Sequence, residues 1–253
     1  MSNTFNFKRL LKYFKYDISN AKENYGLSLI LWGCLPLIAY VVIQLFSLLV
    51  FRNGLVSFPP EVRMAFFYIS NTGVLLTFGS KVYGPVTERK YGSNWTMVPA
   101  SAIEKTVSLF VISCVILPVC LLAVFAASNG LICLMDPNSG QFLPDFNPGG
   151  LFNNMSGIFF LNWTTTVLAF TLGALFFRKR KIAKTLLCTF VVTFLFLILT
   201  VLIFGKSHIS GEEIDEFFND AEFFVNLILN VLYFLITAVL VIGTYFRIKR
   251  IKY

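Results

Sequence analysis

Six long apolar runs limit what this chain can fold into. They cover about residues 27–51, 64–82, 105–129, 151–177, 183–205 and 223–246. A helix needs about 20 mostly apolar residues to cross the hydrocarbon core of a bilayer, and each run is close to that length. The cores of the runs contain no Asp, Glu, Lys, Arg or His. The pattern predicts an all-α integral membrane protein with six transmembrane helices in a single transmembrane domain, residues 1–253.

The composition agrees with a lipid-embedded chain. Charged residues make up 13% of it and hydrophobic residues 57%, whereas a soluble domain carries about 25% charged residues. The five cysteines show neither zinc-type spacing nor the pattern of a secreted disulfide framework. A single histidine, His208, excludes a multi-histidine metal site, so we expect no bound metal. Pro36 and Pro118 are expected to kink the first and third runs.

The basic residues predict the orientation. Of the 21 Lys and Arg residues, 18 fall in four segments: the N-terminal segment, the loop after the second run, the loop after the fourth run and the C-terminus. With six spans these segments share one side, which the positive-inside rule assigns to the cytoplasm. The other side keeps only Arg52, Arg63 and Lys206. Both termini are therefore expected to be cytoplasmic. Since no basic, aromatic-rich soluble face is present, we expect no nucleic-acid partner.

The N-terminal segment, residues 1–26, is predicted to form a cytoplasmic amphipathic helix. Apolar residues fall at helical spacing on one face, and bases cover the rest: Leu10, Leu11, Phe14 and Ile18, then Lys8, Arg9, Lys12 and Lys15. Such a helix lies in the membrane interface with its bases toward anionic headgroups. A basic anchor that only sets topology remains an equal alternative.

Ser210 and Glu213 form the S-x-x-E pattern of a capping box on the outer side. The pattern predicts a short outer helix over about 206–222, before the last span.

The stretch "TERKYGSNWTMVPASAIEK", residues 87–105, interrupts the apolar runs on the cytoplasmic side. Ser101 and Glu104 make a second capping box immediately before the third run, and Pro99 ends whatever structure precedes it. Upstream, charged residues precede two aromatics and a glycine: Glu88, Arg89, Lys90, Tyr91, Gly92 and Trp95. We expect a short helix here, within a loop over 83–104. The residues alone leave open whether it binds a partner or is a structural loop.

This stretch resembles the first cytoplasmic loop of type-2 ATP-binding-cassette (ABC) exporter permeases, in the variant found in Bacteroidetes. The matching positions are Glu88, Gly92, Met97, Val98, Pro99, Ala100, Ser101, Glu104 and Lys105. The sequence departs from the usual pattern at Ser93, Asn94 and Trp95. The predicted layout resembles the same family: an amphipathic N-terminal helix, spans 1–2 in 27–82, spans 3–4 in 105–177, and spans 5–6 with a basic tail in 178–253.

The resemblance implies a permease subunit of the bacterial cytoplasmic (inner) membrane. The N-terminal helix would be an elbow, and the loop a coupling helix that contacts a separate ATPase subunit through Glu88, Arg89, Lys90, Tyr91, Gly92 and Trp95. Tyr91 and Trp95 would be the anchors of that contact. Pro99, Ser101, Glu104 and Lys105 would link it to the third span. A second permease chain, in a homodimer or a heterodimer, would complete the pathway.

The chain itself is not expected to be an enzyme. Its nearest approach to a phosphate loop is Gly205-Lys206-Ser207, and Thr200 stands where that loop needs a glycine. ATP and Mg would therefore be bound by the partner subunit, and this chain needs no cofactor. The lack of ionisable groups inside the spans also argues against proton-coupled or ion-coupled transport.

Polar residues in two spans have two interpretations. They are Ser70, Asn71 and Thr77 in the second run and Asn162, Thr165 and Thr166 in the fourth. Small and hydroxyl residues allow close packing of transmembrane helices, or they line a pathway for an amphiphilic cargo. A different class of protein also remains open: a stand-alone polytopic membrane scaffold or sensor without transport activity.

Overall fold

The computed structural model describes residues 5–51, 56, 58–87, 95, 97–136, 155–204 and 222–251. Within these residues the regular structure is helical and contains no strand, which confirms the all-α class. The predicted outer helix before the last span lies outside the described residues. The elements are α1 (Phe7–Gly33), α2 (Leu35–Phe46), η1 (Ser47–Phe51), α3 (Pro60–Val82), η2 (Gly84–Thr87), α5 (Ala102–Val111), η3 (Ile112–Ile116), α6 (Leu117–Met135), α8 (Met155–Phe176), α9 (Lys181–Phe204) and α11 (Glu222–Arg250).

Two of the described helices are long and apolar enough to cross a membrane. They are the continuous helix of α5, η3 and α6, Ala102–Met135, and the Asn230–Arg250 part of α11. α1 and α2 meet the same criterion only as a pair, bent by 47° at their junction. α8 contains a shorter apolar helix, Phe160–Phe176. The structure thus has two or three candidate membrane-crossing helices, and the count of six spans remains a prediction.

The first two elements differ from the expected boundary between elbow and span. The elbow was expected to end at residue 26, but α1 continues to Gly33 and the break falls at Cys34. Pro36 explains this position, because it has no N–H and its ring excludes the carbonyl one turn earlier. The elbow and the beginning of the first apolar run therefore form one uninterrupted helix.

The third apolar run is also irregular where proline was expected to disturb it. A π-helical turn, η3, separates α5 from α6, and Pro118 is the second residue of α6. π-helical turns insert one residue into a helix and break its regular row of side chains. The helix axis nevertheless continues through the turn, so that Ala102–Met135 forms one helix.

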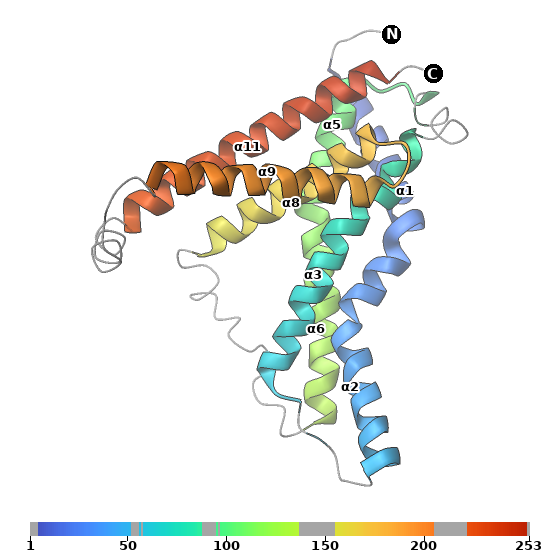
Figure 1. Ribbon diagram of the computed structural model, residues 1–253. Coiled ribbons are helices and arrows are strands. Elements are labelled where there is room, and N and C mark those ends of the chain that lie inside the picture. The colour runs from blue at the N-terminus through green and yellow to red at the C-terminus, as the bar shows by residue number, and fades with distance from the viewer. Residues whose placement is uncertain are drawn as a thin grey trace.

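The helices form two groups that share one end (Figure 1). α2, α3 and α6 run side by side as one group, whereas α8, α9 and α11 lean away from it. α8 contacts α3, α9 and α11 and so joins the groups. The beginning of α1, the end of α11 and α5 all lie near the shared end in Figure 1.

A buried core lies at this shared end. It contains residues from segments far apart in the sequence, among them Tyr83, Trp95, Leu109, Trp163 and Ile248. Two of the four basic segments each make a side-chain hydrogen bond to the backbone of another segment. Lys181 Nζ donates to the Gly84 carbonyl (2.6 Å), and Arg247 Nε donates to the Leu175 carbonyl (2.9 Å). These two basic segments thus lie at the shared end of the described structure.

The far end of the first group is closed by polar contacts. Gln44 pairs with the backbone N–H and carbonyl of Val56 at 3.0 and 2.6 Å. Asp136 accepts a hydrogen bond from the Phe58 N–H (3.1 Å), and the buried Arg63 donates to Asn129 Oδ1 (2.9 Å). Because buried polar groups need partners, these contacts fix the ends of α2, α3 and α6 relative to one another.

Candidate functional site

Glu104 joins α1, the predicted elbow helix, to the beginning of α5. Its Oε1 accepts hydrogen bonds from the Asn6 N–H (2.9 Å) and Arg9 Nη2 (2.7 Å). Its Oε2 accepts from Arg9 Nε and from the Ser101 N–H, both at 2.8 Å. The Glu104 side chain is fully buried, and that of Arg9 is 29% exposed. We call these four residues the Glu104 latch. A bidentate arginine–carboxylate pair fixes direction as well as distance, so the latch sets the orientation of α1 on α5.

The capping box predicted at the same carboxylate is confirmed. Ser101 is the N-cap of α5, and its Oγ accepts from the Glu104 N–H at 3.3 Å while Glu104 returns to the Ser101 N–H. One carboxylate thus serves two purposes: it caps its own helix and holds another. Glu104 lies before the predicted third span. The Arg9 guanidinium, aided by the N–H donors of Asn6 and Ser101, lowers the pKa of Glu104 to about 2.

A second contact between the same helices involves Asp17, which the sequence did not single out. Asp17 is fully buried on α1, and its Oδ2 accepts from Ser108 Oγ (2.7 Å) and Tyr83 OH (3.4 Å). Burial raises the pKa of Asp17 to about 6, although the two hydroxyl donors and the charge of Lys105 oppose the shift. The sequence did carry a signal. Arg9, Tyr13 and Asp17 repeat every four residues and so share a helix face.

Lys105 connects this contact to the end of the loop between α3 and α5. Its Nζ donates to the Trp95 carbonyl (2.8 Å) and lies 4.1 Å from the centroid of the Trp95 ring. Trp95 is only 6% exposed and belongs to the buried core. Trp95 thus packs within its own chain, whereas an anchor on the surface of the loop was expected. Its charged sequence neighbours suggested exposure, but distant segments cover it.

The other predicted coupling residues fall into two sets. Pro99 is exposed, as is Met97 with 74% of its surface accessible, so the described end of the loop offers surface to a partner. Five positions lie outside the described residues and stay predictions: Glu88, Arg89, Lys90, Tyr91 and Gly92.

The buried carboxyl gives a prediction for pH dependence. The pKa of Asp17 is about 6 in the folded chain and 3.8 as its ordinary value. Between these values the folded state binds more protons, so the free energy of unfolding should fall as pH rises through this window. The charged and titratable groups that face Asp17 are Tyr13, Tyr83 and Lys105. Asp17→Asn keeps an acceptor for Ser108 and removes the titration, so its melting temperature relative to wild type should rise with pH.

The measurement is thermal unfolding of both proteins in detergent at about pH 4.5 and about pH 7.5. Glu23→Gln is the matched control, because Glu23 is an exposed carboxylate on the same helix. A difference between Asp17→Asn and wild type that stays constant with pH would show that Asp17 does not titrate in this window.

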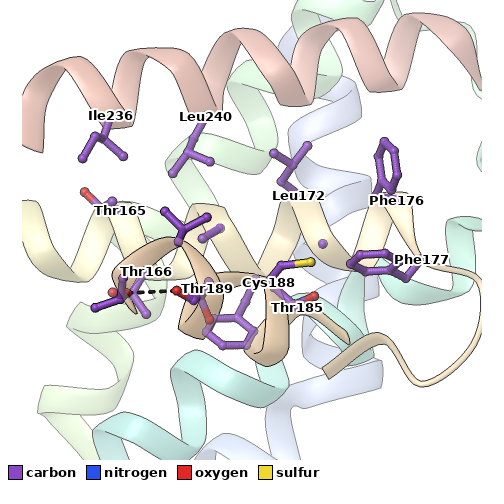
Figure 2. A pocket seen from close by; sticks show the side chains of 15 residues that line it. Thr165, Thr166, Leu172, Phe176, Phe177, Thr185, Cys188, Thr189, Ile236 and Leu240 are labelled. Carbon is purple, nitrogen blue, oxygen red and sulfur yellow. Dashed lines mark hydrogen bonds between the residues drawn. The ribbon is translucent and has the colours of Figure 1, made fainter. Parts of the chain in front are cut away.

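A second feature is a cavity of about 540 Å³ between α8, α9 and α11 (Figure 2). Side chains from all three helices line it, and in Figure 2 Ile236 and Leu240 extend from α11 toward α8. Five threonines contribute hydroxyl groups to the otherwise apolar wall: Thr165, Thr166, Thr185, Thr189 and Thr193. Most of these hydroxyls donate to carbonyls of their own helix, as Thr165 does to Leu161 (2.7 Å) and Thr185 to Lys181 (2.8 Å). Thr165 also shares a hydrogen bond with Thr237 of α11 (2.9 Å).

Of the polar residues proposed to line a pathway, some line this cavity and the others take part in helix packing. Thr165 and Thr166 line the cavity, and Thr166 donates to the exposed Asn162 (3.4 Å). The residues on α3 lie elsewhere. Ser70 and Thr77 donate to the carbonyls of Phe66 and Gly73, Thr77 also bonds Tyr25 OH, and Asn71 is half-buried. Sequence reasoning missed the threonines of α9, although positions 185, 189 and 193 repeat every four residues on one helix face.

Among the described residues, no group of three or more His, Cys, Asp or Glu side chains is placed to hold a metal ion. Comparisons with protein-family models, with curated proteins and with solved structures found no match.

Proposed function

We propose that this chain is the transmembrane (permease) subunit of an ATP-driven ABC-type exporter in the bacterial inner membrane. In this proposal it crosses the membrane six times with both termini in the cytoplasm. A second permease chain completes the translocation pathway, and a separate ATPase subunit binds ATP and Mg. The chain has no enzymatic activity of its own.

The Glu104 latch is the observation that supports this proposal most directly. A permease must carry a push at its cytoplasmic loop into the membrane, which requires a stiff connection. The described end of the loop is held by Lys105, and the following helix begins at a capping box that shares its carboxylate with Arg9. A displacement of the loop would therefore move α5 and the elbow helix together.

The threonine-lined cavity is a second support, on the membrane side. α8 and α11, which form two of its walls, also meet α5 or the loop after α3: α11 contacts α5, and α8 contacts η2. A motion of α5 would thus reach the cavity through direct packing. Hydroxyl groups on an apolar wall suit an amphiphilic cargo, because such a cargo has both apolar surface and groups that form hydrogen bonds.

The test is co-purification with an ABC ATPase encoded beside this chain's gene. We expect the ATPase to remain bound to the purified permease in lipid nanodiscs, and the permease alone to hydrolyse no ATP. If the single chain turns over ATP, or if wild type retains no ATPase, the proposal is wrong.

Glu104→Gln probes the coupling step within the same experiment. It removes the charge from a buried carboxylate with four donors, and Arg9 is partly solvated, so we expect a loss of about 1.5 kcal/mol in unfolding free energy. The ATPase should stay bound, because residues 88–94 are unchanged, while the permease-dependent part of ATP hydrolysis falls several-fold. Glu23→Gln is the matched control and should leave both quantities unchanged. Equal hydrolysis by the two variants would exclude the latch from coupling.

A further inference from the structure

We propose that the chain binds one anionic phospholipid in a groove between α1 and the π-helical turn η3, with an acyl chain in the groove and the phosphate at Lys22. This inference needs only that the chain is embedded in a membrane. It does not depend on the exporter function.

The groove has a lining that suits an acyl chain and room for part of its length. Its volume is about 260 Å³, and its wall is almost entirely apolar. Side chains from α1, α3 and the η3–α6 segment line it, including Ala21, Tyr25, Leu29, Phe78, Ile116 and Cys120. The two ends of the π-helical turn, Ile112 and Ile116, both face the groove. The turn breaks the regular row of side chains on the α5–η3–α6 helix. α1 therefore does not pack tightly against the turn, and the groove remains between them.

Among the described residues that line the groove, Lys22 alone is charged. It is exposed, as are Lys8, Lys12 and Lys15, and spacings of four, three and seven residues place all four on one face of α1. A parallel apolar stripe on the same helix contains Phe7, Leu11, Phe14 and Ile18, and Ile18 lines the groove. The apolar stripe thus leads into the groove, and the basic stripe borders it at Lys22.

This arrangement sets the depth of the groove in the bilayer. A helix with such stripes lies in the interface, with its apolar side toward the acyl chains and its bases at the level of the headgroups. The mouth of the groove at Lys22 is then at headgroup level. A second ammonium lies close to a residue of the groove lining. Lys81 Nζ is 6.0 Å from the centroid of the Tyr25 ring and donates to Ser28 Oγ (2.7 Å). Two positive charges beside an apolar groove favour a lipid with a net negative headgroup over a zwitterionic one.

The experiment is native mass spectrometry of the purified chain, in whatever complex it forms, titrated with phosphatidylglycerol or phosphatidylcholine of identical acyl chains. We expect the first phosphatidylglycerol to bind about tenfold more tightly than the first phosphatidylcholine. Lys22→Gln should remove most of this preference and leave phosphatidylcholine binding unchanged. Lys12→Gln is the matched control, because it removes a charge from the same stripe away from the groove, and it should change the first affinity less than about twofold.

A groove-filling variant tests the acyl-chain half of the proposal. A Cβ added at Gly26 would contact only Lys22 Cγ at 3.7 Å, an ordinary distance, so Gly26→Leu should fold and place its side chain in the groove. We expect it to lose tight binding of the first lipid of either kind, with an unchanged melting temperature. Two results would overturn the proposal. One is equal weakening by Lys22→Gln and Lys12→Gln, which indicates diffuse attraction to the basic stripe. The other is unchanged binding in Gly26→Leu, which places the lipid elsewhere or reveals a protein-binding surface.

Discussion

Trp95→Ala is expected to lower the free energy of unfolding by about 3 to 5 kcal/mol, the range for truncating a large buried aromatic side chain. The Trp95 ring is 6% exposed within the core that joins the two groups of helices. It also faces the Lys105 ammonium at 4.1 Å, and removing it leaves that cation only the more distant Tyr13 ring, at 6.0 Å from the ring centroid. The measurement is thermal unfolding in detergent together with the yield of monodisperse protein.

Met97→Ala is the matched control, two residues further along the same loop. Met97 is 74% exposed, so its truncation should change the unfolding free energy by less than about 0.5 kcal/mol. Retention of the ATPase partner separates the two interpretations of Trp95. If Trp95→Ala melts like wild type but no longer retains the ATPase, the ring is an interface anchor after all, and its assignment to the core is wrong.

Gly79→Leu is expected to lower the free energy of unfolding by about 3 kcal/mol, at the upper end of the usual cost of overpacking. A Cβ at Gly79 would lie 2.8 Å from the backbone N and Cα of Thr171 on α8. Backbone atoms cannot rotate out of the way as a side chain does, so α3 and α8 would have to separate. Since α8 joins the two groups of helices, the effect should spread to the cavity between α8, α9 and α11.

Gly243→Leu is the control for this change. A Cβ at Gly243 would meet only the end of the Leu172 side chain, at 3.5 Å, and we expect a change near zero. Comparison of the two melting temperatures isolates the close approach from the general effect of replacing a helical glycine. If the Gly79→Leu and Gly243→Leu proteins have the same melting temperature, α3 and α8 are free to move apart.

Local patterns in the sequence predicted local structure well. The capping box at Ser101 and Glu104 marked the first turn of α5, and Pro36 marked the break after α1. These signals depend on hydrogen bonds and steric contacts within about four residues. The apolar runs likewise predicted helices, because lipid leaves backbone groups no partner outside their own helix.

The contacts that make the candidate site were not predictable in the same way. Arg9 and Glu104 are 95 residues apart, and Asp17 and Ser108 are 91 apart. In the sequence, Arg9 and Glu104 are each equally compatible with a solvated surface. Only the packing of α1 on α5 brings the two side chains together. The burial of Trp95 likewise depends on distant segments, and the charged residues next to it in the sequence suggested the opposite.

The order of synthesis determines when the Glu104 latch can form during membrane insertion. Arg9 leaves the ribosome 95 residues before Glu104, an interval of roughly 5 to 20 s at ordinary rates of translation. During that time the elbow helix has no carboxylate to hold it. Its exposed apolar residues Phe7 and Leu11 and its lysines give it a resting place on the membrane surface. We therefore expect the newly synthesised α1 to lie at the membrane interface until α5 has been made. The contact between Arg9 and Glu104 then fixes its final position.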